Sequence, residues 1–258
     1  MVRHFYERIP GWFDFEDIYT SAVRDAPDGA VFVEVGSWFG RSTAFMAVEI
    51  ANSGKRIRFY AVDTWEGSLN EPDSRQISRE CGGSIYGHFL QNMRAGGVLD
   101  FVRPIHLPSV DAAGWFDEES LDFCFLDAAH DYHHVRADIL AWKPKVKTGA
   151  LLAGHDIHRY EVAPAVQDVL PWSEVTTAGE SWLWRKTQLV LYDAQPADTG
   201  SPFLLSHVSL SSVSVHGTVQ EMFCSPVWPV GSADPAARTD SCPREAAAKD
   251  SAEDGPER

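Results

Sequence analysis

The segment at residues 31–42 constrains the fold of this chain more than any other part of the sequence. A near-continuous apolar run, Val-Phe-Val-Glu-Val, leads into a turn that contains Gly36 and Gly40, and a helix-forming stretch follows from Ser42. Such a run suits a strand that is covered on both faces, and glycine lets the backbone turn tightly and approach a ligand. Many α/β proteins begin a nucleotide-type site with this order of strand, glycine turn and helix. The segment therefore predicts an α/β protein with a ligand at this turn.

The spacing of the glycines limits which class of ligand the turn can bind. The pattern is Glu-x-Gly-x-x-x-Gly, whereas a dinucleotide fingerprint is Gly-x-Gly-x-x-Gly. Trp38 stands where that fingerprint has a glycine, which disfavours the close approach of a pyrophosphate. We expect an adenosine-bearing ligand other than a dinucleotide, and hydride transfer to a nicotinamide ranks last. The alternative is that Gly36 and Gly40 serve only the turn.

A second predicted strand ends in an acidic residue. After the helical stretch at residues 42–51, the apolar run at residues 57–62 ends at Asp63. In mononucleotide-binding halves of α/β sheets, an acid at this place accepts hydrogen bonds from ribose hydroxyls. We therefore predict that Asp63 binds a ribose, the alternative being a solvated carboxylate at a strand end.

Two later apolar runs, at residues 121–126 and 149–153, are each followed by ionisable side chains. If both are parallel strands of one sheet, these side chains converge at one edge. Carboxylates can hold a divalent ion such as Mg²⁺, which keeps several waters and needs few protein ligands. The predicted metal ligands are Asp127 and Asp156, with His155 either a third ligand for a softer ion or a residue that orients the substrate.

His130 has a different predicted role. An imidazole titrates near neutral pH, so a histidine beside a bound hydroxyl can act as a general base. The alternative is that His130 caps the helix expected to begin near Asp131.

With these four segments in place, the chain resembles the class I S-adenosylmethionine-dependent methyltransferases. More narrowly, it is similar to a bacterial group of sugar O-methyltransferases that is related to the catechol-type enzymes. The resemblance covers about residues 10–186 and rests on the motifs at residues 34–42, 61–68, 126–132, 142–149 and 153–156. It implies a Rossmann-like, doubly wound α/β fold with a mostly parallel seven-stranded sheet and an antiparallel terminal strand.

The resemblance also implies the residues of the site. The positions implied to bind the cofactor are Glu34, Gly36, Ser37, Gly40, Asp63, Thr64, Trp65, Ser109 and Asp127. Within this set, the glycine turn would hold the methionine part, Asp63 the ribose, and Ser109 would line the adenine pocket. By the same resemblance, Asp127 and Asp156 match the metal-ligand positions and His130 the base. Related enzymes often carry an acidic or amide residue where this chain has His155.

The expected activity is transfer of a methyl group from S-adenosylmethionine to a hydroxyl of a small molecule, such as a sugar or a catechol-like ring. The main task would be to place the acceptor oxygen against the methyl group. A divalent metal, most simply Mg²⁺, would lower the pKa of the acceptor, and a base would remove its proton. Two alternatives stay open: a nitrogen or carbon acceptor with no catalytic metal, and a non-catalytic cofactor-binding or scaffold protein.

The composition of the chain limits the classes of partner that it can bind. A formal net charge of −15 argues against nucleic acid or an anionic membrane as a partner. The N-terminus is mixed and charged, and no apolar run has membrane-spanning length, so we expect a cytoplasmic protein with a small-molecule substrate. Association between copies of the chain stays open.

The sequence also predicts how the chain is divided. Residues 1–192 are expected to form the methyltransferase domain, residues 193–230 a Ser/Val-rich extension that is either a docking strand or loosely ordered, and residues 231–258 a disordered tail. Within the domain, a helix is expected at residues 14–24. An insertion at residues 64–97 is expected to have a lid or loop in its first half and a helix in its second.

Overall fold

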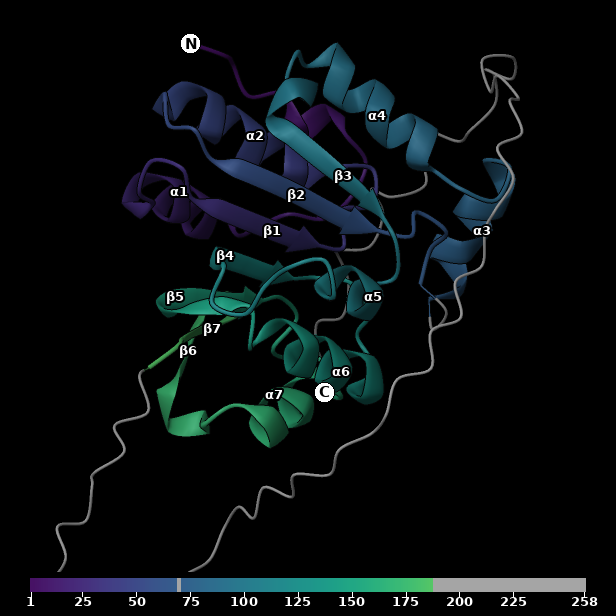
Figure 1. The fold of residues 1–258 in the computed structure, drawn as a ribbon. Coiled ribbons are helices and arrows are strands. Elements are labelled where there is room, and N and C mark those ends of the chain that lie inside the picture. The colour runs from purple at the N-terminus through teal and green to yellow at the C-terminus, as the bar shows by residue number, and fades with distance from the viewer. Residues whose placement is uncertain (69–70, 188–258) are drawn as a thin grey trace, which may run out of the picture. The chain divides into compact units, whose positions relative to one another are not determined.

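In the computed structural model, which describes residues 1–68 and 71–187, seven strands form one sheet in the order β3-β2-β1-β4-β5-β7-β6 (Figure 1). Strand β7 runs antiparallel to both of its neighbours, and the other adjacent pairs are parallel. The strands are β1 (Val31–Val35), β2 (Arg58–Asp63), β3 (Val102–His106), β4 (Leu121–Leu126), β5 (Val146–Gly154), β6 (Val175–Ala178) and β7 (Ser181–Arg185). The predicted mostly parallel seven-stranded sheet is confirmed, with its antiparallel strand next to the edge.

Strand β1 lies in the interior of the sheet and pairs with both β2 and β4. The chain builds outward from β1 to β2 and β3 on one side, and then returns to β4 and β5 on the other. Ligands of open α/β sheets bind outside the carboxyl ends of the strands at such a reversal. The glycine turn that follows β1 therefore lies at the place where this fold class binds ligands.

Helices cover both faces of the sheet. Side chains of a strand alternate between its faces, so Phe32 packs with α1, α2 and α4, whereas Val33 packs with α5, α6 and α7. The helices are α1 (Glu16–Asp25), α2 (Arg41–Ser53), α3 (Pro72–Glu80), α4 (Tyr86–Ala95), α5 (Ser109–Ala113), α6 (Tyr132–Trp142) and α7 (Val162–Val169). Short 3-10 turns are η1 (Tyr6–Arg8), η2 (Leu99–Phe101) and η3 (Trp172–Glu174). The result is a three-layer α/β/α arrangement (Figure 1).

The insertion between β2 and β3 is more regular than a loop. Its second half forms the expected helix, α4, which buries Phe89 and Met93. Its first half contains α3, a helix that the sequence left as either a lid or a loop. Pro72 stands in the first turn of α3, where its missing N–H group costs nothing. Because Ser78 is the one buried residue of α3, this helix lies largely on the surface.

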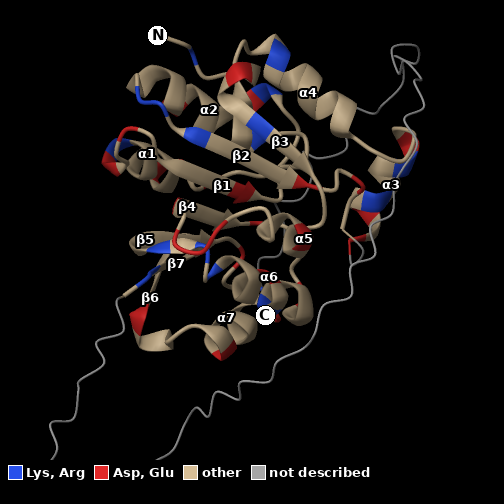
Figure 2. Cartoon of the chain, in the orientation of Figure 1, with Lys and Arg blue, Asp and Glu red and all other residues tan. Residues whose placement is uncertain are grey.

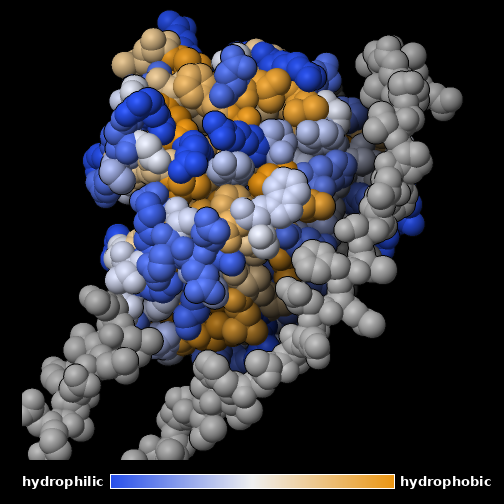
Figure 3. Space-filling view, viewed as in Figure 1, coloured by the Kyte–Doolittle hydropathy of each residue, from blue (hydrophilic) through white to orange (hydrophobic). Residues whose placement is uncertain are grey.

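The surface of the described part is mixed. Acidic and basic residues are interspersed over the elements in the view of Figure 2, and polar residues alternate with apolar ones on the face in Figure 3. No helix in residues 1–68 and 71–187 combines the length and the apolar character that a membrane span requires. The predicted extension at residues 193–230 and the predicted tail at residues 231–258 lie outside the described residues.

Candidate functional site

The glycine turn depends on close backbone contacts. Gly36 has a φ of 91°, and a Cβ atom added there would lie 1.8 Å from the carbonyl oxygen of Asp127. Gly40 has a φ of 90°, and its added Cβ would lie 2.7 Å from Cε of Met93. Both positions are therefore restricted to glycine by backbone conformation and by packing. A contact between these glycines and a cofactor stays a prediction.

Glu34 supports the turn from inside the core. Its side chain is 1% exposed and accepts hydrogen bonds from the hydroxyls of Tyr19 and Ser37, both at 2.8 Å, and from Thr43. Burial raises the pKa of Glu34 to about 7, although these hydroxyl donors favour the charged form. The carboxyl group thus ties the end of β1 to α1 and α2.

Asp63 closes the turn from the neighbouring strand. Its Oδ2 accepts hydrogen bonds from the backbone N–H groups of Ser37 and Trp38, both at 2.8 Å, and its Oδ1 accepts one from Trp65 at 2.7 Å. Burial raises the pKa of Asp63, and the backbone donors oppose this effect. Asp63 therefore holds the turn in shape, and its predicted contact with a ribose would be an additional role.

Aromatic rings gather beside Asp63. Trp65 is fully buried, has a φ of 53°, and contacts the rings of Tyr86, Phe89 and His106 at centroid distances of 4.6, 4.9 and 5.3 Å. Its indole Nε1 has no hydrogen-bond partner within the described residues. A buried N–H group without a partner is costly, and a hydrogen-bond acceptor on a bound ligand would remove this cost.

Two other predicted cofactor residues lie in the same region. Thr64 follows Asp63 directly and is half-buried. Ser109 begins α5, and its hydroxyl accepts a hydrogen bond of 2.9 Å from the indole N–H of Trp142. This bond fixes the Ser109 side chain to α6.

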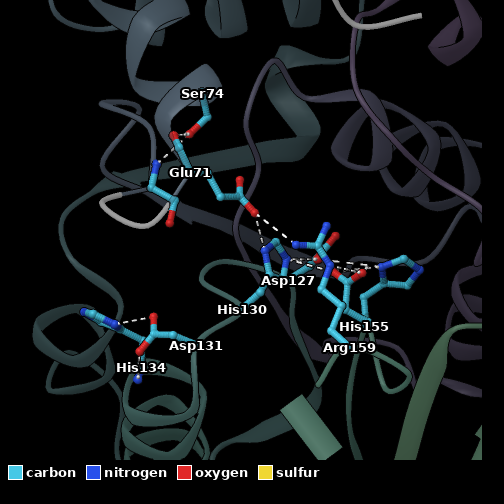
Figure 4. A network of polar contacts seen from close by, with 10 residues as sticks. Glu71, Ser74, Asp127, His130, Asp131, His134, His155 and Arg159 are labelled. Atoms are coloured by element: carbon cyan, nitrogen blue, oxygen red, sulfur yellow. Dashed lines mark hydrogen bonds and ion pairs between the residues drawn. The ribbon is translucent and has the colours of Figure 1, made fainter. Parts of the chain in front are cut away.

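The predicted acidic cluster does form at the carboxyl ends of β4 and β5 (Figure 4). His130 Nε2 lies 2.7 Å from Oδ2 of Asp156 and 3.6 Å from Oδ1 of Asp127. One ligand atom from each of these residues lies within 4.8 Å of the others. Adjacent parallel strands thus bring together side chains that the sequence separates, as predicted.

His130 is enclosed by acids on both sides of its ring. Its Nδ1 lies 2.5 Å from Oε1 of Glu71, while its buried Nε2 faces the two aspartates without an aligned hydrogen bond. Burial alone would lower the pKa of His130, but the carboxylates of Asp127, Asp156 and Glu71 favour the charged ring, outweigh burial and raise the pKa to about 11. His130 does not cap α6, because the side chain of Asp131 caps that helix.

The sequence analysis did not predict two residues of this network. Glu71 comes from the insertion, immediately before α3, and no motif marks it. Arg159 follows β5 and contacts Oδ1 of Asp156 at 2.9 Å and Oε1 of Glu71 at 3.4 Å. Asp156 itself has a φ of 58°. An uncommon backbone conformation of this kind is often found at functional sites.

His155 lies at the border of the cluster. Its Nδ1 is 3.5 Å from Oδ2 of Asp156 and 3.9 Å from Oδ1 of Asp127, while its Nε2 is 2.8 Å from Oδ1 of Asp14. Burial lowers the pKa of His155, but the neighbouring carboxylates outweigh it and raise the pKa to about 9. His155 thus joins the cluster to the segment before α1.

Comparisons with known proteins agree with this geometry. A family profile described as a methyltransferase domain matches residues 33–157, from β1 to the residue after Asp156. A curated relative, the uncharacterized protein y4gI of Sinorhizobium fredii, is 27% identical over 124 residues, which are 48% of this chain and 13% of that protein. The chain therefore spans a small part of that relative's length.

Solved structures of O-methyltransferases are similar to this chain. The structure of the O-methyltransferase NovP matches with a TM-score of 0.53 at 17% identity and covers 67% of this chain and 79% of that chain. The structure of CalS11, a TDP-rhamnose 3′-O-methyltransferase of calicheamicin biosynthesis, matches with a TM-score of 0.47 at 16% identity and covers 66% of this chain and 76% of that chain. At this identity, the likeness to NovP shows a common fold.

Proposed function

We propose that this chain transfers a methyl group from S-adenosylmethionine to a hydroxyl oxygen of a small molecule, with a divalent metal ion assisting, since a family profile described as a methyltransferase domain matches residues 33–157. One observation carries the proposal. The strand ends beside the glycine turn bring together Asp127, His130 and Asp156, and a general base beside a metal site can activate a hydroxyl for methyl transfer.

The cofactor fits the edge of the sheet next to the turn. The turn places backbone at the ligand-binding end of β1, Asp63 lies at the end of β2, and Trp65, whose indole N–H has no partner within the described residues, follows two residues later in the chain. Sulfonium methyl transfer is an in-line displacement, so the residues around the turn need to hold the cofactor with its methyl group toward the acceptor. No covalent enzyme intermediate is needed.

The residues at the acidic edge fit a hard divalent ion. Asp127 and Asp156 offer carboxylate oxygens, which are the ligands that Mg²⁺ prefers. The unaligned Nε2 of His130 faces the same space, so the site has a nitrogen without a well-made hydrogen bond beside two acids. The chemistry supplied by a bound divalent ion would be a lower pKa of the acceptor hydroxyl and a partial neutralisation of the two aspartates.

His130 is placed to take the proton of the acceptor. With Nδ1 bonded to Glu71, a neutral ring presents the lone pair of Nε2 to the space between the aspartates. Glu71 thereby fixes the orientation and the tautomer of the ring. The raised pKa of His130 describes the site with the aspartates charged and uncompensated, and a cation bound there would lower it.

The proposal is tested first by binding and then by turnover. Calorimetric titration with S-adenosylhomocysteine, and separately with NAD⁺, is made with Mg²⁺ and with EDTA. We expect S-adenosylhomocysteine to bind and NAD⁺ not to bind. Transfer of tritium from methyl-labelled S-adenosylmethionine to TDP-rhamnose and to 3,4-dihydroxybenzoate then probes the two acceptor classes, and we expect EDTA to abolish it.

Three outcomes would contradict parts of the proposal. Failure to bind S-adenosylhomocysteine under all conditions would remove the methyltransferase function. Methyl transfer that persists in EDTA would exclude a role for the metal ion. Transfer to amine or carbon acceptors, with none to hydroxyls, would remove the O-methyltransferase assignment.

A further inference from the structure

A strap at residues 9–15 connects η1 to α1 and crosses the edge of the sheet where the site lies. Its burial alternates residue by residue: Trp12 and Asp14 are exposed, whereas Phe13 is half-buried and Phe15 is buried. In an extended chain, alternate side chains point to opposite sides. Trp12 and Asp14 therefore share one side of the strap, the side on which Asp14 reaches His155.

The inner side of the strap is held by aromatic packing. The ring of Phe13 lies 5.0 Å from that of Phe45 on α2, and Phe15 stacks on Phe125 of β4 with a centroid distance of 4.3 Å. These contacts fix the backbone of the strap across the carboxyl ends of the central strands. The strap is thus a built part of the fold and not a loose N-terminal segment.

Two contacts tie the strap to the two halves of the site. At one end, the carbonyl oxygen of Gly11 accepts a hydrogen bond of 2.9 Å from Nη1 of Arg41, and a Cβ atom added to Gly11 would lie 3.6 Å from Cδ1 of Trp38 in the glycine turn. At the other end, Asp14 contacts His155 at 2.8 Å. Trp12 and Phe13 lie between these contacts, and while Phe13 is half-buried, Trp12 leaves a large apolar ring 73% exposed.

We propose that His155 is a positioning residue, which with Asp14 fastens the strap so that Trp12 forms one wall of the methyl-transfer site. The identity of the ligand that this wall contacts rests on the proposed function. The contact between Asp14 and His155, which we call the clasp, does not. An indole ring offers a flat apolar surface to a cofactor or to an acceptor ring. The wall would exclude water from one side of the transferred methyl group.

The clasp also explains why a histidine stands at position 155. Its two nitrogens reach carboxylates on opposite sides, Asp14 on the strap and Asp156 in the cluster. An acidic side chain at position 155 could not pair with Asp14 in this way, because two carboxylates repel each other. The histidine joins the strap to the cluster, and the structure assigns it this role in place of a metal-ligand role.

The clasp is tested by proteolysis of the full chain without any ligand. Chymotrypsin cleaves after Trp12 and Phe13 only when the strap opens, and mass spectrometry quantifies the strap peptide separately from cleavage elsewhere. We expect Asp14→Asn and His155→Phe each to raise the rate of strap cleavage about fivefold, because an ion pair at a partly exposed site contributes a modest free energy to a local opening. Asp17→Asn is the matched control, since Asp17 is exposed on α1 and makes no clasp.

Unchanged strap cleavage in both clasp variants would overturn the positioning role. Circular-dichroism melting of each variant separates local opening from global unfolding, because only global unfolding lowers the melting temperature. Should His155→Phe fail to fold, Asp14→Asn decides, because that change is made on an exposed residue.

The wall is tested by oxidative footprinting of tryptophan with S-adenosylhomocysteine as the probe. We expect the ligand to reduce oxidation of Trp12 at least about threefold and to leave Trp172 unchanged, because Trp172 is 45% exposed and lies in η3, just before the edge strand β6. Binding measured by calorimetry without protection of Trp12 would overturn the wall. Absence of binding would contradict the proposed function instead, and the cleavage experiment would still decide the clasp.

Discussion

The imidazole of His130 lies against the carboxylate of Asp156, with 2.7 Å between Nε2 and Oδ2. The two residues meet because β4 and β5 pair in parallel, with Leu126 opposite Gly154, so that the chain following each strand emerges at the same edge. This contact places a potential proton acceptor at the carboxylates best suited to hold a metal ion. Substitutions can separate metal binding, cofactor binding and proton removal.

Removal of one carboxylate should weaken metal binding. We expect Asp156→Asn to lower the affinity for Mn²⁺, used as a probe for Mg²⁺, by more than about tenfold, because one charged oxygen ligand is lost. Asp168→Asn should leave the affinity unchanged, since Asp168 is exposed and pairs with Arg136 on the surface. Electron paramagnetic resonance of free Mn²⁺ measures both. Equal affinity in the Asp156 variant and the control would exclude a metal site at this edge.

Substitutions should distinguish the residue that supports cofactor binding from the residue that acts as the base. We expect Asp63→Ala to weaken binding of S-adenosylhomocysteine at least about tenfold, because the turn loses the acceptor that holds the N–H groups of Ser37 and Trp38. His130→Ala should leave this affinity unchanged and lower turnover about a hundredfold or more. Calorimetry and tritium transfer measure the two effects. Equal loss of cofactor binding in both variants would overturn the assigned roles, and loss of Mn²⁺ affinity in His130→Ala would make His130 a ligand.

Stability should fall as the pH rises through the titration of Glu34. Burial raises the pKa of Glu34 from 4.5 to about 7, so the folded protein binds an extra proton between these values. Its stabilisation by protonation is therefore complete below about pH 4.5 and lost as the pH rises to about 7, a change of roughly 3 kcal/mol. Glu34→Gln keeps the shape and one oxygen acceptor but cannot titrate.

Urea unfolding at pH 5 and pH 8 measures this effect. The wild-type protein should lose about 2 kcal/mol more than Glu34→Gln between the two pH values, because part of the transition lies below pH 5. Other titrating groups contribute equally to both proteins and cancel in the comparison. An identical pH dependence in the two proteins would show that Glu34 stays charged in its buried position.

The turn should tolerate no side chain at Gly36. Gly36→Ala combines a left-handed backbone with a Cβ placed against the carbonyl of Asp127, and we expect it to lower the free energy of unfolding by more than about 3 kcal/mol. Gly54→Ala is the matched control, because Gly54 has a φ of 69° and no atom within 4 Å of its added Cβ. It should cost about 1 kcal/mol. Thermal unfolding of both variants measures the two losses of unfolding free energy. Equal losses would contradict the close contact at Gly36.

Local sequence was enough to place most helices and strands. The apolar run at residues 31–35, the glycine turn after it and the acidic residue at the end of β2 carry their structural information within a few neighbouring positions, because burial on both faces, a positive φ and a strand end are local requirements. Asp127, His130 and Asp156 could be predicted for the same reason. Each lies within a few residues of the end of a strand whose direction the α/β pattern implies.

The tertiary structure alone decided which side chains complete the cluster. Glu71 reaches His130 across 59 positions, Arg159 reaches Glu71 across 88, and His155 reaches Asp14 across 141. These contacts depend on how α3 and the strap pack against the sheet, and no periodicity or short motif encodes that packing. The sequence by itself determined the fold class and the core of the candidate site, whereas packing between distant segments determined the surroundings that orient its side chains.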